Sequence, residues 1–527
     1  MRRALVQLCR AALGLFALIF AAVLVCDRRV AYALSGVNVP LAPNVVLLLV
    51  ALLLVGAGVL LWTRVRKGSA GPTDEGAGRE RRLGHACVVV PLVLLAYQLF
   101  VYFVAGVSAG WDVWFLQRAS VADLSAVQSS EEWIAYFSMY PNNLFLLWVL
   151  RAIEAVRSVV TPFLAPATLA AAASCVAVSL SCLLFMRVAD KSVPSWPVRV
   201  GSVCVFVALV GMSPWFMIPY SDTFALLACM TMLWCRACGR GWWTRWLLLG
   251  LVAALGYAIK PTVIFALVAI VLTAVMVREW RSASLRPVVR AAACSLVGFA
   301  VGFALSHVAV ASLGLSLRAD QQFSATHFLM MGLNEETQGI YSWDDVLMSQ
   351  AAKDAAERRE MNLTVARQRA AALGPSGMAR LFGRKALIAF NDGTFAWGVE
   401  GNFFAETRAG DSPASRAVSS FYYPDGSGYS VFCTVEQTLW LLVLLGIPLG
   451  LFGLAGRGVE IEPRRLALFS AMLASLVMLT LFLLLFEVRA RYLYLYGGYF
   501  VLLAALGFEG AFDFARRRAA SRLSDGS

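Results

Sequence analysis

The sequence predicts an all-α polytopic membrane protein with about twelve transmembrane helices. Of its 527 residues, 60% are hydrophobic and only 15% are charged, and the mean hydropathy is +0.72. Soluble proteins are about 45–50% apolar. Apolar runs of about 20 residues, long enough to cross a bilayer, recur through most of the chain. These observations favour a membrane-embedded bundle over a soluble domain.

The predicted spans share an apolar run bounded by charged or turn residues. They cover residues 5–26, 44–62, 84–107, 162–186, 199–216, 219–236, 244–259, 261–279, 289–311, 436–456, 466–486 and 492–512. The run that follows Arg2 and Arg3 has no clear small-residue cleavage site, so we expect it to stay as the first span.

The chain divides into four predicted parts. A linker over 63–82, rich in Gly and charged residues, separates a two-helix addition from the core. The parts are the addition and cytoplasmic linker (1–83), the transmembrane core with the first outer loop (84–311), an extracytoplasmic loop region (312–435), and the C-terminal helices with a basic cytoplasmic tail (436–527).

The segment 135–157 is ambiguous between a span and a helix on the membrane surface. Its apolar run, 144–150, is too short to span, and Arg151, Glu154 and Arg157 follow at helical spacing. If the segment crossed the bilayer, the basic loops after it would lie outside. Because cytoplasmic loops carry an excess of Lys and Arg, we predict a surface-lying helix.

The formal net charge of +13 comes from basic residues spread over short loops between spans. This distribution is typical of cytoplasmic loops, so we expect cytoplasmic termini and no nucleic-acid partner. Arg28 and Arg29 are the short-loop exceptions. The residues assigned to the cytoplasmic side are Arg187, Lys191, Arg199, Arg236, Arg240, Arg245, Arg278, Arg281, Arg286, Arg290, Arg457, Arg464, Arg465 and Arg516–Arg518.

This topology brings most polar groups at the outer ends of spans to one face. They are Asp112, the turns Pro219–Asp222 and Lys260–Thr262, the loop 312–435 and the segment Glu487–Tyr492. Ionisable groups at membrane boundaries are costly to keep, which makes them functional candidates. We therefore expect a site on the extracytoplasmic face.

The loop 312–435 is the one large polar segment. Residues 351–373 read as a polar helix that ends at Gly374 and Pro375. Residues 375–390 alternate apolar and basic side chains in the manner of a helix on a bilayer surface.

The cysteines and histidines predict neither a disulfide framework nor a metal centre. Ten of the eleven cysteines lie in or beside apolar runs, and Cys235 and Cys238 lack a second ligand pair. The acids of the outer face are scattered rather than paired as D-x-D. We therefore expect no cofactor and no metal, although a divalent ion stays open.

Several short motifs follow one another in a recognisable order. Asp112 comes soon after the first core span, and an aromatic amphipathic segment ends in Tyr140-Pro141. A span then leads from Pro214 to Asp222, and a Glu-x-Arg-x-Arg-Tyr sequence from Glu487 opens the last helix.

In this order the chain resembles the GT-C superfamily of polyprenyl-phosphate-sugar glycosyltransferases, on the side of the protein O-mannosyltransferases and aminoarabinose transferases. The resemblance covers residues 84–512. It implies a lipid-linked sugar donor, and acceptor contacts from Tyr140, Asn142 and Asn143. The family often has two adjacent acids where Asp112 stands alone, and Pro-Pro where Pro141-Asn142 stands.

The chemistry of such a transfer suits the residues. A base must take the acceptor proton, and we assign this role to Asp112 at the water–lipid boundary. Attack opposite the leaving group inverts the anomeric centre. Cations must stabilise the departing phosphate, and Arg489, Arg491 and Lys260 are the candidates.

The remaining candidates have structural alternatives. Asp222 either caps its helix, or binds a sugar hydroxyl, or supplies the second carboxylate. Glu487 is a pairing partner for an arginine, and His327 is a donor to sugar or phosphate unless it is only structural. We expect the partners to be a polyprenyl-phosphate-linked sugar, membrane lipids and a glycan, lipid or protein acceptor.

Other functions stay open. A twelve-span secondary transporter would place charges near span midpoints and have two similar halves, and a lipid-linked glycan polymerase or ligase would share the arginines. A scaffold protein would use the loop 312–435 to bind a partner. The charges at span ends favour the transferase, in the plasma membrane, with its active site outside.

Overall fold

The computed structural model describes residues 2–26, 39, 41–68, 75–238, 241–277, 286–400, 406–407, 410, 412–454 and 462–524. The fold of this part is helical apart from one short antiparallel pair. There β1 (Val107–Ser108) lies beside β2 (Glu406–Thr407), with Val107 opposite Thr407. The predicted all-α membrane class is confirmed. Arg28, Arg29, Arg240, Arg278, Arg281 and Arg457 lie outside the described residues.

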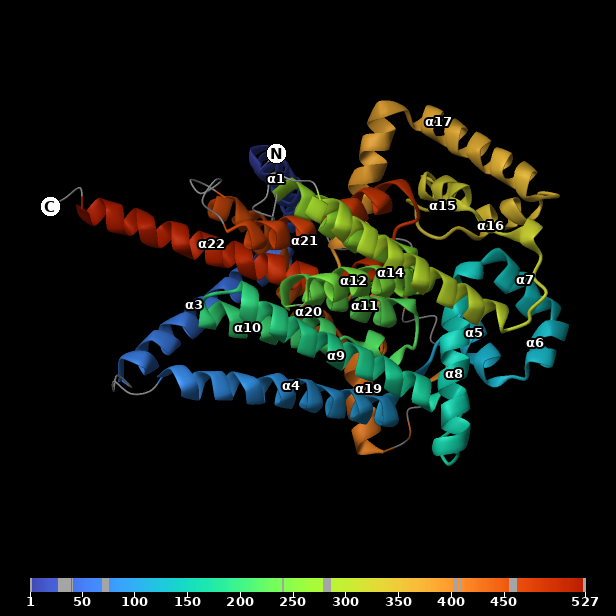
Figure 1. Ribbon diagram of the computed structural model, residues 1–527, viewed down its shortest axis with the longest axis horizontal. Coiled ribbons are helices and arrows are strands. Elements are labelled where there is room, and N and C mark those ends of the chain that lie inside the picture. The colour runs from blue at the N-terminus through green and yellow to red at the C-terminus, as the bar shows by residue number, and fades with distance from the viewer. Residues whose placement is uncertain are drawn as a thin grey trace.

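Eight helices in the described ranges are long and apolar enough to cross a membrane. They are α1 (Arg2–Val25), α4 (Glu75–Ala105), α9 (Thr168–Ser192), α12 (Trp242–Ile259), α14 (Arg286–Ala311), α20 (Tyr429–Leu454), α21 (Pro463–Leu485) and the stretch Ala490–Ala519, which includes most of α22 (Gly497–Ser524). Several of them run side by side along the long axis of the molecule (Figure 1).

Each of the twelve predicted spans coincides with a helix. Three of those helices are shorter or less apolar, namely α10 (Trp196–Phe206), α11 (Ser221–Cys238) and α13 (Ile264–Val277), and in α3 (Asn44–Gly68) the fully described apolar stretch is Asn44–Gly58. A count of twelve crossings therefore stays a prediction. The start predicted at residue 162 lies at Thr168, because the turn before it includes Ala167 in a left-handed conformation, φ 63°.

The segment between α4 and α9 forms several short helices instead of one. They are α5 (Trp111–Val121), α6 (Leu124–Ser129), α7 (Glu131–Met139) and α8 (Leu144–Val160). The helix predicted over 135–157 is thus divided at Tyr140 and the 3-10 turn Pro141–Asn143. Pro141 lacks a backbone N–H and disfavours α conformation at Tyr140, so α7 ends there.

Helix α8 lies across the ends of the long helices rather than along them (Figure 1). Arg151 joins it to the end of α5 by donating from Nη1 to the carbonyls of Ala119 and Ala122, each at 2.7 Å. At its far end Val159 and Phe163 are 80% and 82% exposed. Contact of this apolar end with the bilayer surface stays a prediction.

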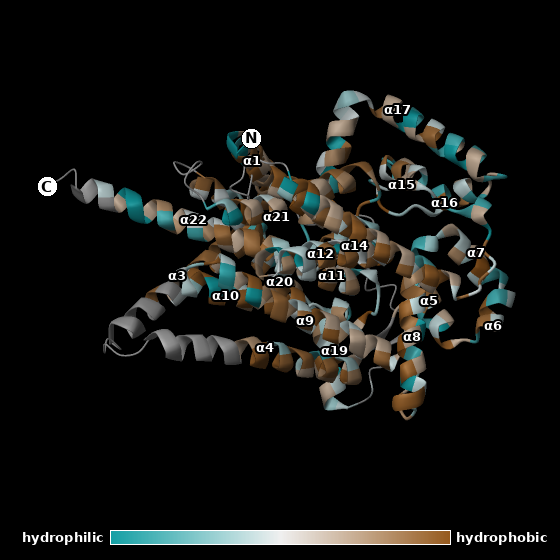
Figure 2. Ribbon diagram, viewed as in Figure 1, coloured by the Kyte–Doolittle hydropathy of each residue, from teal (hydrophilic) through white to brown (hydrophobic). Residues whose placement is uncertain are grey.

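The loop region predicted over 312–435 is also helical. It contains α15 (Ala325–Gly332), α16 (Trp343–Gln350), α17 (Ala355–Phe390), α18 (Trp397–Glu400) and α19 (Pro413–Tyr422). Helix α17 combines the two predicted helices, with a kink at Gly374, φ 58°. Helices α5 to α7 and α15 to α17 gather at one end of the molecule, and the apolar residues concentrate in the bundle (Figures 1 and 2).

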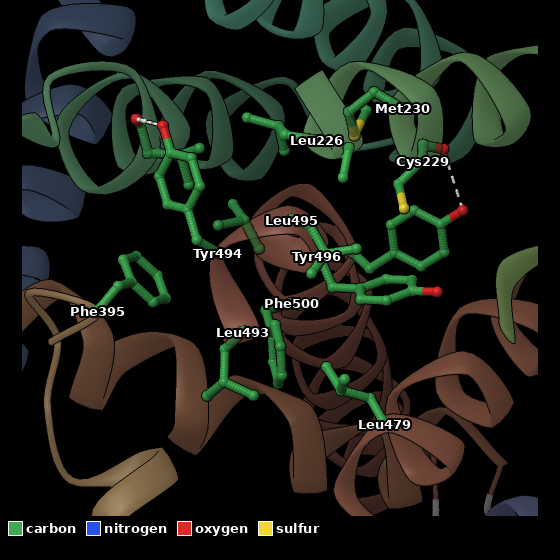
Figure 3. Packing of buried hydrophobic residues seen from close by; sticks show 14 of the residues in the cluster. Leu226, Cys229, Met230, Phe395, Leu479, Leu493, Tyr494, Leu495, Tyr496 and Phe500 are labelled. Carbon is green, nitrogen blue, oxygen red and sulfur yellow. Dashed lines mark hydrogen bonds between the residues drawn. The ribbon is translucent and has the colours of Figure 1, made fainter. Parts of the chain in front are cut away.

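The 3-10 segment Ala490–Tyr496 enters the middle of the bundle (Figure 3). Leu493 and Leu495 are fully buried. The buried hydroxyls of Tyr494 and Tyr496 donate to the carbonyls of Val210 (3.0 Å) and Thr262 (2.9 Å). Because buried hydroxyls need such partners, these bonds fix the orientation of the segment and of Arg491 within it.

Candidate functional site

Asp112 is held by two tyrosine hydroxyls. Its Oδ1 accepts a hydrogen bond from Tyr136 of α7, and its Oδ2 accepts one from Tyr220, just before α11, both at 2.8 Å. Asp112 itself is only partly buried, in the first turn of α5. Helix N-termini favour a negative charge. The carboxylate is therefore fixed in direction by elements 24 and 108 residues away in the chain.

Tyr136 is in turn supported by its neighbours. Asn143 donates to its oxygen at 2.7 Å, and Phe115 stacks on its ring with the centroids 4.1 Å apart. Burial, together with the negative charge of Asp112, raises the pKa of Tyr136 well above its usual range. The phenol thus keeps its proton near neutral pH and can donate it to Asp112.

A second carboxylate, Asp222, lies in the first turn of α11 and is 2% exposed. Its Oδ1 accepts from Lys260 Nζ, and Arg491 Nε lies 3.4 Å from its Oδ2. The carboxylate thus faces two cations from distant turns. Pairing with cations, rather than helix capping, is the contact that the structure gives Asp222.

Arg491 connects the two carboxylates through aromatic rings. Its guanidinium carbon lies 4.2 Å from the ring centre of Trp111 and 5.5 Å from that of Tyr220. Trp111 precedes Asp112, and Tyr220 donates to it. Cation–π contacts of this kind are worth about 0.5–2 kcal/mol. Asp112, Asp222 and Arg491 therefore belong to one cluster, as the topology predicted.

Glu487 and Arg489 form the next part of the site. Glu487 Oε1 accepts from the Tyr492 hydroxyl at 3.2 Å and lies 3.8 Å from Arg489 Nε. The Tyr492 ring centre is 4.6 Å from Lys260 Nζ. Burial raises the pKa of Glu487, while the charges of Arg489 and Arg491 oppose the shift. This segment therefore joins the cluster around Asp222.

The Tyr-Pro-Asn-Asn turn lies beside Asp112, and His327 is set back from it. Tyr140 is 5.4 Å from Tyr136 by ring centres, and its pKa is raised by burial and then by the charge of Asp112. Asn142 donates weakly to Asn143, at 3.4 Å. His327 is fully buried, and its Nδ1 lies 2.7 Å from Ser349 Oγ.

His327 approaches the site only through another ring. Phe323 stacks on it with the centroids 4.1 Å apart, and Phe323 meets Tyr140 at 5.4 Å. Burial lowers the pKa of His327 to about 4, so the imidazole is neutral at physiological pH. This arrangement suits packing beneath the site better than contact with a substrate.

Tyr341 and Lys385 are two residues near the site that sequence reasoning missed. Tyr341 is 40% exposed, and its pKa is raised to about 12 by burial and by the charges of Asp112 and Glu487. Lys385 is fully buried. Neither has a local sequence signal, because each is brought in by the packing of the outer loop.

The charges of the cluster balance. Three acids (Asp112, Asp222, Glu487) meet three cations (Lys260, Arg489, Arg491), which gives 3 − 3 = 0 formal charges. Glu487 is the acid that burial pushes toward its neutral form. The three cations are the members of the cluster that could face an anionic ligand such as a phosphate.

Among the described residues, no group of three or more His, Cys, Asp or Glu side chains is placed to hold a metal ion. Metal dependence stays a prediction, and the chemistry below is argued from the side chains alone.

A family model described as "conserved hypothetical integral membrane protein" matches residues 9–512. No curated protein matches the chain. Among solved structures, the chain is similar to the archaeal oligosaccharyltransferase AglB from Archaeoglobus fulgidus, in complex with an inhibitory peptide and a dolichol-phosphate. The identity is 14% and the TM-score 0.42, over 86% of this chain and 53% of that one. This chain thus spans about half the length of AglB.

The chain is also similar to ArnT from Cupriavidus metallidurans bound to undecaprenyl phosphate. The identity is 16% and the TM-score 0.29, over 80% of this chain and 76% of that one.

Proposed function

The chain belongs to the family described as conserved hypothetical integral membrane proteins, and from that premise we propose that it is a membrane glycosyltransferase. It transfers a sugar from a polyprenyl-phosphate carrier to a hydroxyl group of a lipid, glycan or protein acceptor. The reaction takes place at the outer face of the plasma membrane and inverts the anomeric centre. The order of motifs that resembles the GT-C superfamily motivates this choice of donor.

One observation carries the proposal. Asp112 is aimed by Tyr136 and Tyr220, and it stands beside a cluster that contains Lys260 and Arg491. A general base and cations for a leaving phosphate are the two charge requirements of the reaction. Here they come from segments that are far apart in the chain and that meet at one end of the bundle.

The bond changes follow from this arrangement. The acceptor oxygen attacks the anomeric carbon while Asp112 takes its proton, so a new carbon–oxygen bond forms. The bond from the anomeric carbon to the phosphate oxygen breaks, and its electron pair leaves with the polyprenyl phosphate. Positive charge on Arg489, Arg491 and Lys260 stabilises that developing charge.

Asp112 accepts hydrogen bonds from two tyrosine hydroxyls. These uncharged donors orient the carboxylate without neutralising its charge. Arg491 is held against Trp111 and Asp222, so a bound phosphate would compete with Asp222 for the guanidinium. The donor phosphate would thus take the place of Asp222 at Arg491 during turnover, and Asp222 would pair with Arg491 again after the phosphate leaves.

A secondary transporter is the main alternative. Transporters place charged residues near the bilayer midplane, at breaks in paired helices. The charged residues of this cluster lie instead in the first turn of a helix or in turns between helices, as Asp222, Lys260 and Arg489 do. This position favours chemistry at a membrane boundary. A glycan polymerase or ligase would use the same groups on a larger donor.

The test is the substitution Asp112→Asn in purified protein reconstituted in liposomes. Polyprenyl-phosphate sugars are supplied together with a lipid, glycan or peptide acceptor that carries a free hydroxyl, and released polyprenyl phosphate is measured by mass spectrometry. We expect at least a 100-fold loss of rate, because the general base contributes about 10²–10⁴-fold. Insertion should stay unchanged, and the melting temperature should fall only modestly, because asparagine still accepts one hydrogen bond through Oδ1.

The matched control is Asp123→Asn, which removes an exposed carboxylate from the same outer segment. It should leave the rate unchanged. Transfer by Asp112→Asn at the wild-type rate would exclude the assigned base. Transport of a solute by both variants, with no transfer by the wild type, would favour the transporter.

A further inference from the structure

Lys385 joins three elements with one ammonium group. It lies in the second half of α17 and is fully buried. Its Nζ donates to the carbonyls of Gly332 and Phe486, each at 2.7 Å. Gly332 is the last residue of α15, and Phe486 follows directly after α21. Carbonyls at helix C-termini lack helical partners and attract cations.

Glycines allow the three elements to come this close. A Cβ on Gly332 would lie 2.5 Å from the Leu485 carbonyl oxygen. A Cβ on Gly339 would lie 2.9 Å from Lys385 Cδ, and Gly339 has φ 75°. Any larger side chain at either position would push the elements apart. The outer loop is therefore in direct backbone contact with the end of α21.

The same junction holds the residue after Glu487. Val488 N donates to the Gly339 carbonyl at 2.9 Å. The backbone on both sides of Glu487 is thus fixed by the outer loop, at Phe486 through Lys385 and at Val488 through Gly339. Arg489 follows directly, and Tyr341 lies two residues beyond Gly339.

We propose that Lys385 is a positioning residue: it ties the outer loop to the segment 486–489 and so holds Glu487 and Arg489 toward the donor phosphate. The inference rests on the proposed function for the identity of the ligand. The junction itself does not, because it is defined by the contacts of Lys385, Gly332 and Phe486.

The position of Lys385 also gives the junction a pH dependence. Burial lowers its pKa from 10.5 to about 7, and the negative charge of Glu487 partly opposes the shift. Glu487 is the titratable group of the described residues whose charge acts on Lys385. The elements packed on its ammonium from α15 and α21 present backbone carbonyls, at Gly332 and Phe486.

The sign of the effect follows from linkage. When the junction opens, Lys385 meets water and its pKa returns toward 10.5, so the open state binds more protons between pH 7 and 10. Raising the pH through this range therefore favours the closed state. A neutral amine still has two N–H groups for the two carbonyls. The junction should thus tighten above about pH 7.

Hydrogen exchange of the full chain in detergent tests the junction. In Lys385→Met, we expect the amides of 486–492 to lose protection by about tenfold or more, because the buried donor to two carbonyls is gone. Arg384→Met, which removes an exposed cation from the neighbouring position, is the control and should change nothing. Unchanged protection in Lys385→Met would overturn the inference.

Lys385→Met could lose protection throughout the protein. In that case the pH dependence of exchange in the wild type and in Lys385→Gln tests the role of Lys385. Protection of 486–492 in the wild type, corrected for the intrinsic exchange rate, should rise about tenfold between pH 7 and 8.5. Lys385→Gln should show no such rise, since glutamine does not titrate. A flat profile in the wild type, with the same protection of 486–492 in Lys385→Gln as in the wild type, would overturn the inference.

Binding of undecaprenyl phosphate, measured by calorimetry, separates this inference from the proposed function. We expect Lys385→Met to bind about tenfold more weakly than the wild type and Arg384→Met to bind equally well. Equal binding by Lys385→Met, despite an exposed 486–492 segment, would refute the positioning role. If the wild type itself binds none, the donor assignment fails and the positioning role falls with it, whereas the exchange data still judge the junction.

Discussion

Trp111 has an unusual backbone conformation, and its ring contacts residues that bind Asp112 and Asp222. Its φ of 45° lies in the left-handed region, which costs a residue with a Cβ roughly 1–2 kcal/mol. Its ring meets Tyr220 at 5.1 Å and Arg491 at 4.2 Å. Strain of this kind persists where surrounding contacts impose it, often at functional sites. Here the ring contacts set the direction in which Asp112 leaves the backbone.

The two tyrosine hydroxyls that donate to Asp112 give a first prediction at the scale of single residues. Tyr136→Phe and Tyr220→Phe each remove one hydrogen bond to the carboxylate. Bonds to a charged group contribute about 1.5–3 kcal/mol, so each variant should transfer roughly 10–100 times more slowly. The rate is measured by polyprenyl phosphate release. Full activity in both variants would show that the hydroxyls do not orient the base.

Asp222 gives a second prediction, about stability. Asp222→Asn takes from Lys260 and Arg491 the carboxylate that pairs them. Loss of one partner of a buried ion pair typically costs about 3–5 kcal/mol. The melting temperature in detergent should fall clearly.

The double variant Asp222→Asn/Lys260→Met provides the control, because it removes one of the two cations together with the carboxylate. It should recover part of the lost stability. If the two substitutions are independent, the double variant is less stable than Asp222→Asn by the full effect of Lys260→Met alone. That result would contradict coupling between these residues.

The sequence could predict the charged members of the site but not their partners. Asp112, Lys260 and Arg491 stand at the ends of apolar runs, and the bias of basic loops assigns those ends to one face. Tyr136 and Tyr220 look like ordinary interfacial aromatics, because a hydrogen bond across 108 residues leaves no local pattern. Lys385 is also hard to single out in the sequence, because other basic residues surround it.

At the level of elements, each apolar run predicted as a span coincides with a helix, while turns decided where helices break. The predicted surface helix 135–157 is divided because Pro141 ends α7 at Tyr140, and this turn brings Asn143 to Tyr136. The two helices predicted on either side of Gly374 are both present, and the non-helical backbone of Gly374 separates them within α17. Proline and glycine positions were visible in the sequence, but the resulting directions depend on tertiary contacts.

Close packing of α12 and α14 gives a prediction at this scale. A Cβ on Gly298 would lie 2.0 Å from the Leu247 carbonyl oxygen, and one on Gly250 would lie 1.9 Å from that of Ser295. Gly298→Ala should therefore force the helices apart and lower the melting temperature, since overpacking costs about 1–3 kcal/mol. Gly201→Ala, on open space in α10, is the control.

That control should be neutral or slightly stabilising, because alanine favours a helix over glycine by about 0.5–1 kcal/mol. Equal melting temperatures for Gly298→Ala and Gly201→Ala would mean that α12 and α14 are not packed backbone to backbone.

For the whole molecule, the distribution of charge sets the expected orientation. The basic end of α22 lies at the far end of the bundle from α5 to α7 and α15 to α17 (Figure 1). Ser195 and Arg199, in the turn before and the start of α10, lie beside Glu509 of α22. The basic residues Arg516–Arg518 of α22 thus lie at the end away from α5 to α7. Composition predicted the fold class, whereas the membrane face on which the site lies stays a prediction.

This separation predicts where each end lies relative to the membrane. A cleavage site for an impermeant protease is inserted at one of two places. The first insertion lies between Ala351 and Lys353, in the outer loop, and the second follows Arg518, in the exposed end of α22. Because Lys and Arg are retained on the cytoplasmic side, protease added to intact cells should cut only the first insertion. Inverted membrane vesicles should show the opposite result. Cleavage after Arg518 in intact cells would place Asp112 in the cytosol, where the proposed outer-face transfer has no route to its acceptor.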